Sequence, residues 1–298
     1  YYIFLKIMII KSHGGKGNQF YCYAMARSIK LNNPKYKVTL DTRNFFKNDK
    51  FRRTNQLSGL TENLDKPLSL SIFYLIPPWL INKAESFFYL ISKHSFLNIF
   101  FEKLYSFDME NTYEDCNFKK SFFYKGYWQD HNIFFKHRMI IFPEIIKAFN
   151  IKKTRNDFKE IFDLNICKKF IALHVREHDI YSMDDISYFF KALSFFKKKY
   201  EKINYKVLVF SDGHKGSQEY INRICKDDTF IKVSKNEDDD FRIMASCDDI
   251  ILSKSTFALW AAYLIDHQKN SPNIVYPADE NFFSHLSKLS VLSNWLRI

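Results

Sequence analysis

The chain has 298 residues, of which 46% are hydrophobic and 26% charged, an ordinary globular composition that can form a sizeable core. This length predicts one large domain or two domains of about 150 residues each. The net charge of +12 indicates an anionic partner, but the basic residues are spread along the chain without an Arg-rich tail, which disfavours a dedicated DNA-binding protein. Five cysteines without a CxxC pair disfavour a disulfide framework or a zinc knot and indicate a reducing compartment.

A glycine-rich turn follows the first predicted strand. Residues 2–10 predict a buried strand, residues 20–30 predict a helix, and the segment HGGKGNQ (13–19) lies between them. A strand, a glycine turn and a helix together place backbone amides and the positive end of a helix near a phosphate. The turn lacks a P-loop pattern, and it is an incomplete dinucleotide fingerprint because Phe20 stands in place of the third glycine.

The middle of the chain is less regular. Residues 67–82 are uncharged but are interrupted by two prolines, so they are too short and too broken for a transmembrane helix. Residues 86–104 are apolar at helical spacing, which favours a core helix over membrane contact. Residues 121–131 mix aromatic side chains with an amide and a carboxylate, a composition that suits packing or a sugar subsite. A helix-like stretch near residues 142–155 and the polar KKTRND segment (152–157) predict a domain boundary.

The second half alternates strands and helices. Strands are predicted at residues 170–175, 206–210, 230–233 and 249–252, and helices at 188–199, 219–226, 241–246 and 257–265. This alternation predicts a doubly wound parallel sheet, with the strand ends 174–179, 211–213 and 253–256 on one edge. Open sheets of this kind bind ligands at that edge.

Each polar cluster at a strand end is weak evidence by itself. The segment HVREHD (174–179) brings imidazole, cation and carboxylate together, but it also fits a strand that runs into a charged loop. The SKST turn (253–256) fits a helix N-cap, and the acidic run 237–240 fits a solvated surface or the start of a helix.

Five segments in a fixed order resemble the family 11 glycosyltransferases, the bacterial α-1,2-fucosyltransferases, and the similarity covers most of the chain. The segments are GGKGNQ (14–19), GYWQD (126–130), HVREHD (174–179), FSD (210–212) and the stretch from the acidic run through SKSTFALWAAYL (240–264). The resemblance implies an α/β, GT-B-like fold with two Rossmann-like domains facing a central cleft. Residues 1–155 would form the N-terminal acceptor-side domain and residues 156–298 the C-terminal GDP-fucose-binding domain, whose last helix would pack back on the first.

The resemblance also implies roles for particular residues. Arg176 is expected to contact the donor diphosphate, with His174 orienting it and Asp179 as the candidate general base. The implied donor-binding residues are Gly17, Asn18, Ser211, Asp212, Asp240, Ser255, Thr256 and Phe257. The expected donor is GDP-fucose, with no cofactor, no metal, and inversion at the sugar carbon.

The chain departs from the family pattern HxRRGD, because Glu177 replaces the second arginine and His178 the glycine. Lys254 and Lys16 each add a positive charge within other motifs, so we hypothesise that the positive field of the site is redistributed rather than lost. A member with weakened activity or another donor is the alternative.

The sequence thus predicts a cytoplasmic fucosyltransferase that acts on a galactose-bearing surface glycan, binds no nucleic acid, and has peripheral membrane contact as an open option. One rival is a non-catalytic basic protein that binds nucleic acid or lipid. The other is a nicotinamide-dependent oxidoreductase resting on Gly15, Gly17 and on Asp41 at the end of a second predicted strand, residues 37–41.

Overall fold

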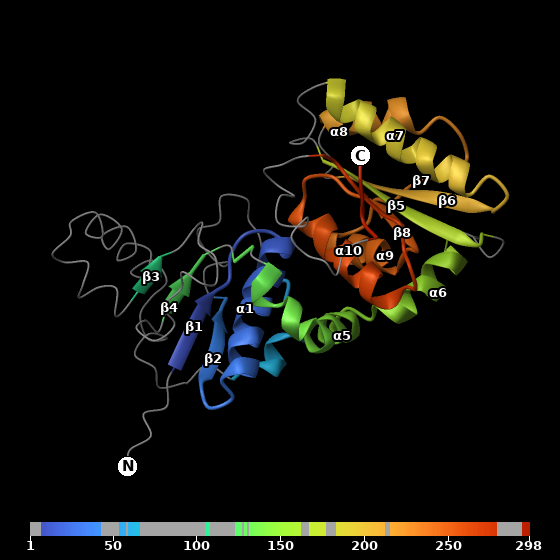
Figure 1. Cartoon of the computed structure of the whole chain (residues 1–298). Coiled ribbons are helices and arrows are strands. Elements are labelled where there is room, and N and C mark those ends of the chain that lie inside the picture. Colours follow the sequence, from blue (N-terminus) through green and yellow to red (C-terminus); the bar gives the residue numbers. More distant parts are fainter. Residues whose placement is uncertain are drawn as a thin grey trace, which may run out of the picture. The chain divides into compact units, whose positions relative to one another are not determined.

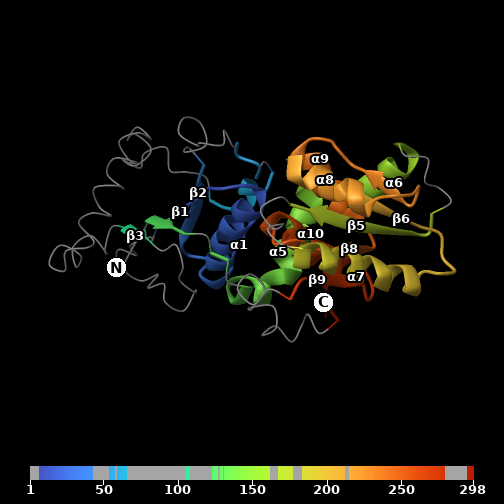
Figure 2. The ribbon, with the colours of Figure 1, turned by 90° about the horizontal axis from the view of Figure 1, so that it is seen from above.

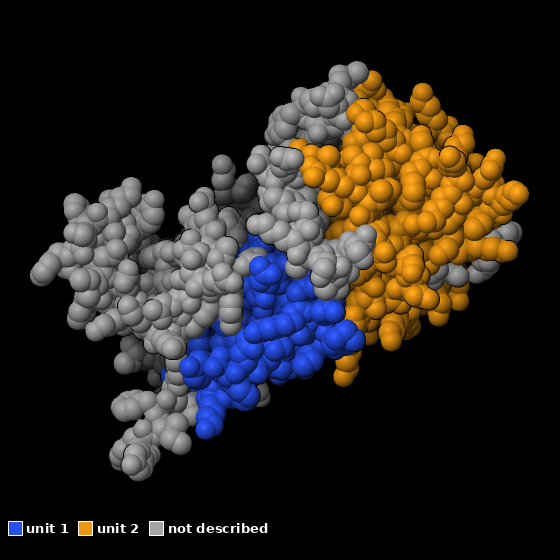
Figure 3. All heavy atoms as spheres, in the orientation of Figure 1, with its two compact units in different colours: residues 1–144 blue, residues 145–298 orange. Residues whose placement is uncertain are grey.

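A computed structural model describes most of the chain as two compact units, Tyr1–Glu144 and Ile145–Ile298 (Figure 3). The described residues are 7–42, 54–57, 59–65, 105–107, 123–126, 128–129, 131–161, 167–176, 183–211, 215–278 and 294–298. The sequence placed the division later, after residue 155, within what the structure shows to be helix α6 (Ile151–Ile161). This helix packs against α9 (Glu237–Ser246) of the second unit. The KKTRND segment is therefore part of a helix and not a linker.

The first unit is built on a parallel sheet in the order β2-β1-β4-β3 (Figure 1). The strands are β1 (Ile7–Lys11), β2 (Lys37–Asp41), β3 (Tyr105–Phe107) and β4 (Phe123–Lys125). Helix α1 (Lys16–Asn32) connects β1 to β2 and lies against both (Figure 2). Three short 3-10 turns, η2 (Thr61–Asn63), η3 (His131–Ile133) and η4 (Phe135–His137), and helix α5 (Arg138–Ala148) complete the described elements of this region.

Two expectations for the first unit were wrong in detail. Helix α1 begins at Lys16 and not at residue 20, because Gly15 already takes the extended conformation of an N-cap. In the bend before the helix, at Gly14 and Gly15, Gly14 has a φ of +77°, which suits glycine. Strand β4 lies inside the aromatic segment 121–131, for which no strand was predicted, since a three-residue strand shows too little alternation to be recognised.

The second unit contains a six-stranded sheet in the order β10-β9-β8-β5-β6-β7, with every neighbouring pair parallel. Its strands are β5 (Lys169–Val175), β6 (Tyr205–Ser211), β7 (Phe230–Lys232), β8 (Asp249–Ile251), β9 (Ile274–Tyr276) and β10 (Leu296–Arg297). Besides α6 and α9, its helices are α7 (Met183–Lys199), α8 (Lys215–Ile224) and α10 (Thr256–Gln268). The predicted alternation of strands and helices is confirmed.

The helices of the second unit cover both faces of its sheet. Along the chain, β5, β6 and β7 follow one another toward one edge of the sheet, and β8 and β9 then continue on the other side of β5 toward the opposite edge. Because crossovers between parallel strands are right-handed, this change of direction places α7 and α8 on one face of the sheet and α9 and α10 on the other. Figure 1 shows this arrangement. Ile171, Leu173 and Val175 of β5 pack with Tyr188 and Phe196 of α7 in the core under one face.

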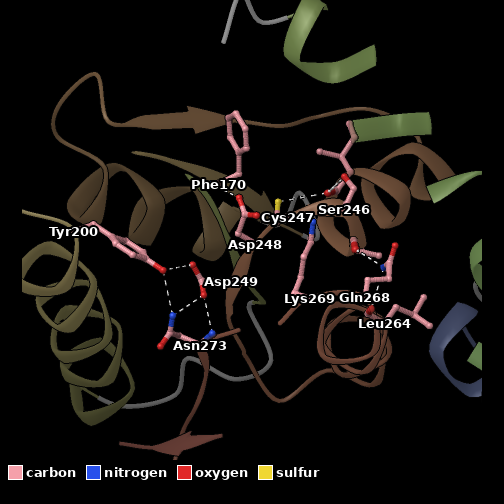
Figure 4. A network of polar contacts seen from close by, with 12 residues as sticks. Phe170, Tyr200, Ser246, Cys247, Asp248, Asp249, Leu264, Gln268, Lys269 and Asn273 are labelled. Carbon is pink, nitrogen blue, oxygen red and sulfur yellow. Dashed lines mark hydrogen bonds and ion pairs between the residues drawn. The ribbon is translucent and has the colours of Figure 1, made fainter. Parts of the chain in front are cut away.

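A network of hydrogen bonds closes the amino-terminal ends of β8 and β9. Asp249 accepts from the Tyr200 hydroxyl at 2.7 Å and from the backbone and side-chain nitrogens of Asn273 at 2.6 and 2.7 Å. Figure 4 shows these three side chains pointing toward one another. Burial, and then the hydrogen bond to Asp249, raise the pKa of Tyr200 above its ordinary value. This carboxylate is thus engaged in holding the strands together, at the end of the sheet opposite the predicted site.

The predicted α/β class with parallel sheets is confirmed, one sheet in each unit. The central cleft stays a prediction, and the last helix predicted to pack back on the first domain falls within residues 279–293, outside the described part. In the part of the chain that is described, no helix is both long and apolar enough to cross a membrane.

Candidate active site

The carboxyl ends of β5 and β8 are joined through a buried side-chain hydrogen bond in the second unit. Leu173 of β5 pairs with Ile251 of β8, so the residues that follow emerge next to each other. Nδ1 of His174 lies 2.5 Å from Oγ of Ser253, and both side chains are buried. The His174 ring also lies 6.0 Å, centroid to centroid, from the ring of Phe257. Two of the five sequence motifs, HVREHD and the stretch 240–264, are therefore linked through His174.

Arg176 and the start of α10 stand at this same edge. Arg176 is the first residue after β5 and is partly buried. Ser255 is the N-cap of α10, where its carbonyl accepts from Leu259 N at 2.9 Å while its side chain makes no capping hydrogen bond. The first turn of α10 holds no acidic residue. A helix start with this composition favours an anion, because the helix dipole and the first backbone amides act in the same direction.

The neighbouring strand β6 supplies Ser211, which pairs with Val175 in the parallel register. Its Oγ accepts from Gln218 Nε2 at 3.0 Å. Thr256 and Phe257 occupy the first two positions of α10 and are partly buried. Asp212, Glu177, His178 and Asp179 lie outside the described residues, so their predicted roles stay predictions.

The acidic run 237–240 opens helix α9, which was one of the alternatives for it. Asn236 is the N-cap and its side chain accepts from Asp239 N at 2.9 Å, while Asp240 Oδ1 accepts from Lys235 N at 3.1 Å. The hydrogen bond from Arg242 lowers the pKa of Asp239 below its ordinary value. Asp240 thus already stabilises the start of the helix, and its predicted part in donor binding would be an additional role.

The glycine motif of the first unit is braced by a buried amide. Gln19 Nε2 donates to the carbonyls of Gly14 at 3.1 Å and Thr54 at 3.0 Å, and its Oε1 accepts from Gln56 N at 2.9 Å. A side chain at Gly14 would meet Asn18, since an added Cβ would lie 2.7 Å from Asn18 Nδ2. The turn therefore requires both the glycine and the glutamine.

The GYWQD segment meets the glycine motif because β1 and β4 are parallel neighbours. His13 Nε2 lies 2.7 Å from the carbonyl oxygen of Gly126, and Gln129 Nε2 donates to Asn18 Oδ1 at 2.9 Å. The sequence predicted that Gly17 and Asn18 lie in a loop, but in the structure they lie in the first turn of α1. They still stand at the carboxyl edge of this sheet, as expected for donors to a phosphate.

Two basic residues had been expected to compensate for Glu177. Lys16 is only 1% exposed, which makes it one of the most deeply buried side chains of the described chain, whereas Lys254 lies partly exposed in the turn before α10. The hypothesis that a lysine compensates for Glu177 is therefore kept for Lys254 alone. Asp41, on which the nicotinamide rival rested, is also buried at the end of β2, which disfavours a contact with a ribose.

The structure brings six predicted residues to one edge of the second sheet, namely His174, Arg176, Ser211, Ser255, Thr256 and Phe257. Sequence reasoning missed Ser253, which holds two of these strand ends together, and Gln19, which braces the glycine motif of the first unit. Ser253 had been noticed only as part of a hydroxyl-rich turn. Within the described ranges, no group of three or more His, Cys, Asp or Glu side chains is placed to hold a metal ion.

Two α/β units, each with a parallel sheet that carries cation, hydroxyl or amide donors at its strand ends, fit the class of proteins that bind phosphate-bearing ligands at such edges. The family model of glycosyl transferase family 11 matches residues 7–298, so the chain belongs to this family. The resemblance seen in the ordered motifs, to a family of fucosyltransferases, is confirmed.

Among solved structures, the chain is similar to NodZ α-1,6-fucosyltransferase from Bradyrhizobium co-crystallised with GDP, with 14% identity, coverage of 88% of this chain and 93% of that one, and a TM-score of 0.47. It is also similar to a mutant of Arabidopsis thaliana FUT1 in complex with GDP, with 12% identity, coverage of 93% of this chain and 71% of that one, and a TM-score of 0.49. A third similar structure is E. coli ADP-heptose lipopolysaccharide heptosyltransferase II, with 11% identity, coverage of 98% of this chain and 90% of that one, and a TM-score of 0.48. No curated protein matches the sequence significantly.

Proposed function

We propose that this protein transfers L-fucose from GDP-fucose to a galactose hydroxyl of a surface glycan, in α-1,2 linkage and with inversion at the sugar carbon. Membership of glycosyl transferase family 11 supports the transferase class. The observation that carries the proposal is the placement of Arg176 and the start of α10 beside the buried pair of His174 and Ser253.

The leaving group in this reaction is GDP, whose diphosphate gains negative charge as the bond to fucose breaks. Preorganised donors that face this charge lower the barrier to the reaction. Arg176 supplies a guanidinium that can hold two phosphate oxygens at once. The hydroxyls of Ser255 and Thr256 and the first amides of α10 supply further donors. In this proposal no metal takes part, and Gly17 and Asn18 add donors from the first unit.

His174 acts on the reaction indirectly in this scheme. Its ring is buried, and Nδ1 is engaged with Ser253, so its contribution is to hold the ends of β5 and β8 in register. The general base remains assigned to Asp179. Asp212 and Asp240 remain assigned to donor binding, with Asp240 as the partner of the guanine amino group. We further propose that the reaction takes place in the cytoplasm, at the inner face of the membrane.

The test is transfer from labelled GDP-fucose to a panel of β-galactosides, with GDP-mannose and UDP-galactose as competing donors. The expected product carries fucose on the galactose 2-hydroxyl, identified by linkage analysis. Transfer to another hydroxyl would overturn the proposed linkage, and transfer from another donor would overturn the proposed donor. Thermal stabilisation by NADH but not by GDP would favour the oxidoreductase instead.

A further inference from the structure

The end of helix α5 is joined to the candidate active site by a row of aromatic rings, all of them in the second unit. The ring of Phe149 lies 5.6 Å, centroid to centroid, from that of Phe241 in α9, edge to face. The ring of Phe241 lies 5.4 Å from that of Phe257, the second residue of α10, again edge to face. Phe257 in turn lies beside His174. The row therefore runs from the connection between the two units to the strand end that is followed by Arg176.

The segment at the far end of this row connects the two units. The boundary between them falls after Glu144, within α5, and the carboxylate of Glu144 is held by Arg27 of the first unit at 2.7 Å. Phe149, one residue beyond the end of α5, packs in the second unit. Between these two anchors the helix contains Pro143 on the side of the boundary that belongs to the first unit, and a helix bends most easily at a proline, because one hydrogen bond is missing there. The two ends of α5 thus belong to different units.

The middle ring of the row, Phe241, is fully enclosed. Its side chain is 0% exposed, and that of Phe149 is 7% exposed. Helix α9, which carries Phe241, packs against both α6 and α10 (Figure 1). Because protein interiors are packed as densely as crystals of small molecules, a shift of one buried ring has to be taken up by the rings that it touches. A shift of Phe257 is therefore passed through Phe241 to Phe149.

The other end of the row lies among the residues that are predicted to bind the donor. Phe257 follows Thr256, the first residue of α10, and Phe241 follows Asp240 in α9. Phe257 belongs to the helical turn whose backbone amides would hold a phosphate, and its ring is only partly buried. A phosphate bound at this turn fixes the backbone that carries the amides, and with it the position of the Phe257 ring.

We propose that Phe241 is a positioning residue that couples GDP binding at the start of α10 to the connection between the two units, through Phe257 and Phe149. Phe241 touches no substrate in this scheme and acts only through the rings beside it. Because such coupling is reciprocal, a connection that holds Phe149 in place also favours the arrangement of α10 that binds GDP. This inference rests on the proposed function, since it takes GDP as the ligand of this edge.

The experiment is amide hydrogen exchange of the full chain, with and without saturating GDP, followed by mass spectrometry. The reporter is residues 145–161, where the backbone N–H of Phe149 donates to Ile145 O at 3.0 Å and that of Thr154 to Asn150 O at 3.1 Å. In the parent protein GDP should slow exchange in this segment about threefold or more, whereas α7, on the other face of the sheet, should not change. In Phe241→Leu the response of residues 145–161 should be lost at saturating GDP.

A second variant, Phe149→Leu, acts at the far end of the row and serves also if Phe241→Leu does not fold. It should raise the Kd of GDP about threefold, because one edge-to-face ring pair is lost. Phe196→Leu is the matched control, since it removes a fully buried ring of the same unit that contacts Phe195 and Tyr200. This control should lower the melting temperature but leave both the GDP affinity and the exchange response unchanged.

The outcomes separate this inference from the proposed function. A parent-like exchange response in Phe241→Leu, or a parent-like GDP affinity of Phe149→Leu, would refute the coupling and leave the donor site intact. An equal loss of affinity in Phe196→Leu would also refute it, because the loss would then follow from lower stability in general. If the parent protein bound no GDP, the proposed function would be wrong, and this inference with it.

Discussion

His174 and Ser253 are joined by a buried hydrogen bond of 2.5 Å, and each stands two residues before a predicted phosphate-binding residue, Arg176 and Ser255 respectively. The bond thus joins the ends of two neighbouring strands, in each case two residues before the predicted phosphate-binding residue. Since Ser255 also donates its backbone N–H to the carbonyl of Ser253 at 2.8 Å, the turn before α10 is held at both residues. Ser253 is therefore a positioning residue of the proposed site.

Ser253→Ala should weaken the binding of GDP about fivefold, as measured by isothermal titration calorimetry. The variant loses one neutral hydrogen bond, worth about 1 kcal/mol, and with it the fixed position of the α10 turn. Ser246→Ala is the matched control, because its buried hydroxyl donates to Ile243 O within α9, away from the strand ends. Parent-like GDP affinity of Ser253→Ala, or an equal loss in the control, would contradict the positioning role.

Arg176→Ala should lower kcat/KM for GDP-fucose by about 30-fold to 1,000-fold, which corresponds to about 2–4 kcal/mol for one preorganised charged donor. Steady-state kinetics with a soluble galactoside measures the change. Arg223→Ala, an exposed arginine on α8 of the same unit, serves as control and should leave the rate unchanged. If the Arg176 variant kept nearly full activity, the diphosphate contact would be wrongly assigned.

Lys254→Asn tests whether positive charge near α10 compensates for Glu177. We expect GDP to bind about twofold to fivefold more weakly, because a partly exposed charge contributes at most about 1 kcal/mol. The loss should shrink as salt is added. Lys235→Asn, an exposed lysine of the same unit, is the control. Unchanged GDP affinity of the Lys254 variant would show that the missing family arginine is not replaced here.

Glu144→Gln should lower the free energy of unfolding by about 1–3 kcal/mol, because Arg27 and Tyr23 would lose a charged acceptor in a largely buried setting. Urea denaturation followed by circular dichroism measures it. Glu160→Gln on the exposed face of α6 provides the comparison and should be near neutral. A neutral Glu144 variant would mean that the network does not stabilise the first unit.

Tyr200→Phe should flatten the loss of stability at alkaline pH. The folded-state pKa of Tyr200 is raised by burial and by Asp249, so its contribution is fully present below the unfolded pKa, near 10, and is lost as the pH rises toward the folded value. Urea midpoints of parent and variant should therefore differ most near neutral pH and converge above about pH 10. A difference that stays constant with pH would refute this contribution.

Much of the fold could be predicted because its signals are local. Strand β2 has the predicted bounds, and β5 to β8 and α7 to α10 lie where hydrophobic runs and turn residues indicated. The predicted bounds of elements were wrong where a capping residue or a partner strand decides the conformation. Helix α1 starts early because Gly15 caps it, and β4 exists because it pairs with β1 and β3 on either side.

The sequence alone determined the family, the alternation of strands and helices, and the segments that carry the candidate site, since motifs and periodicity are written in neighbouring residues. Only the tertiary structure decided which side chains hold those segments together. The partners of His174 and His13 lie 79 and 113 positions away in the chain. Parallel pairing of strands brings such residues to one edge of a sheet, and no local pattern records which of them will meet.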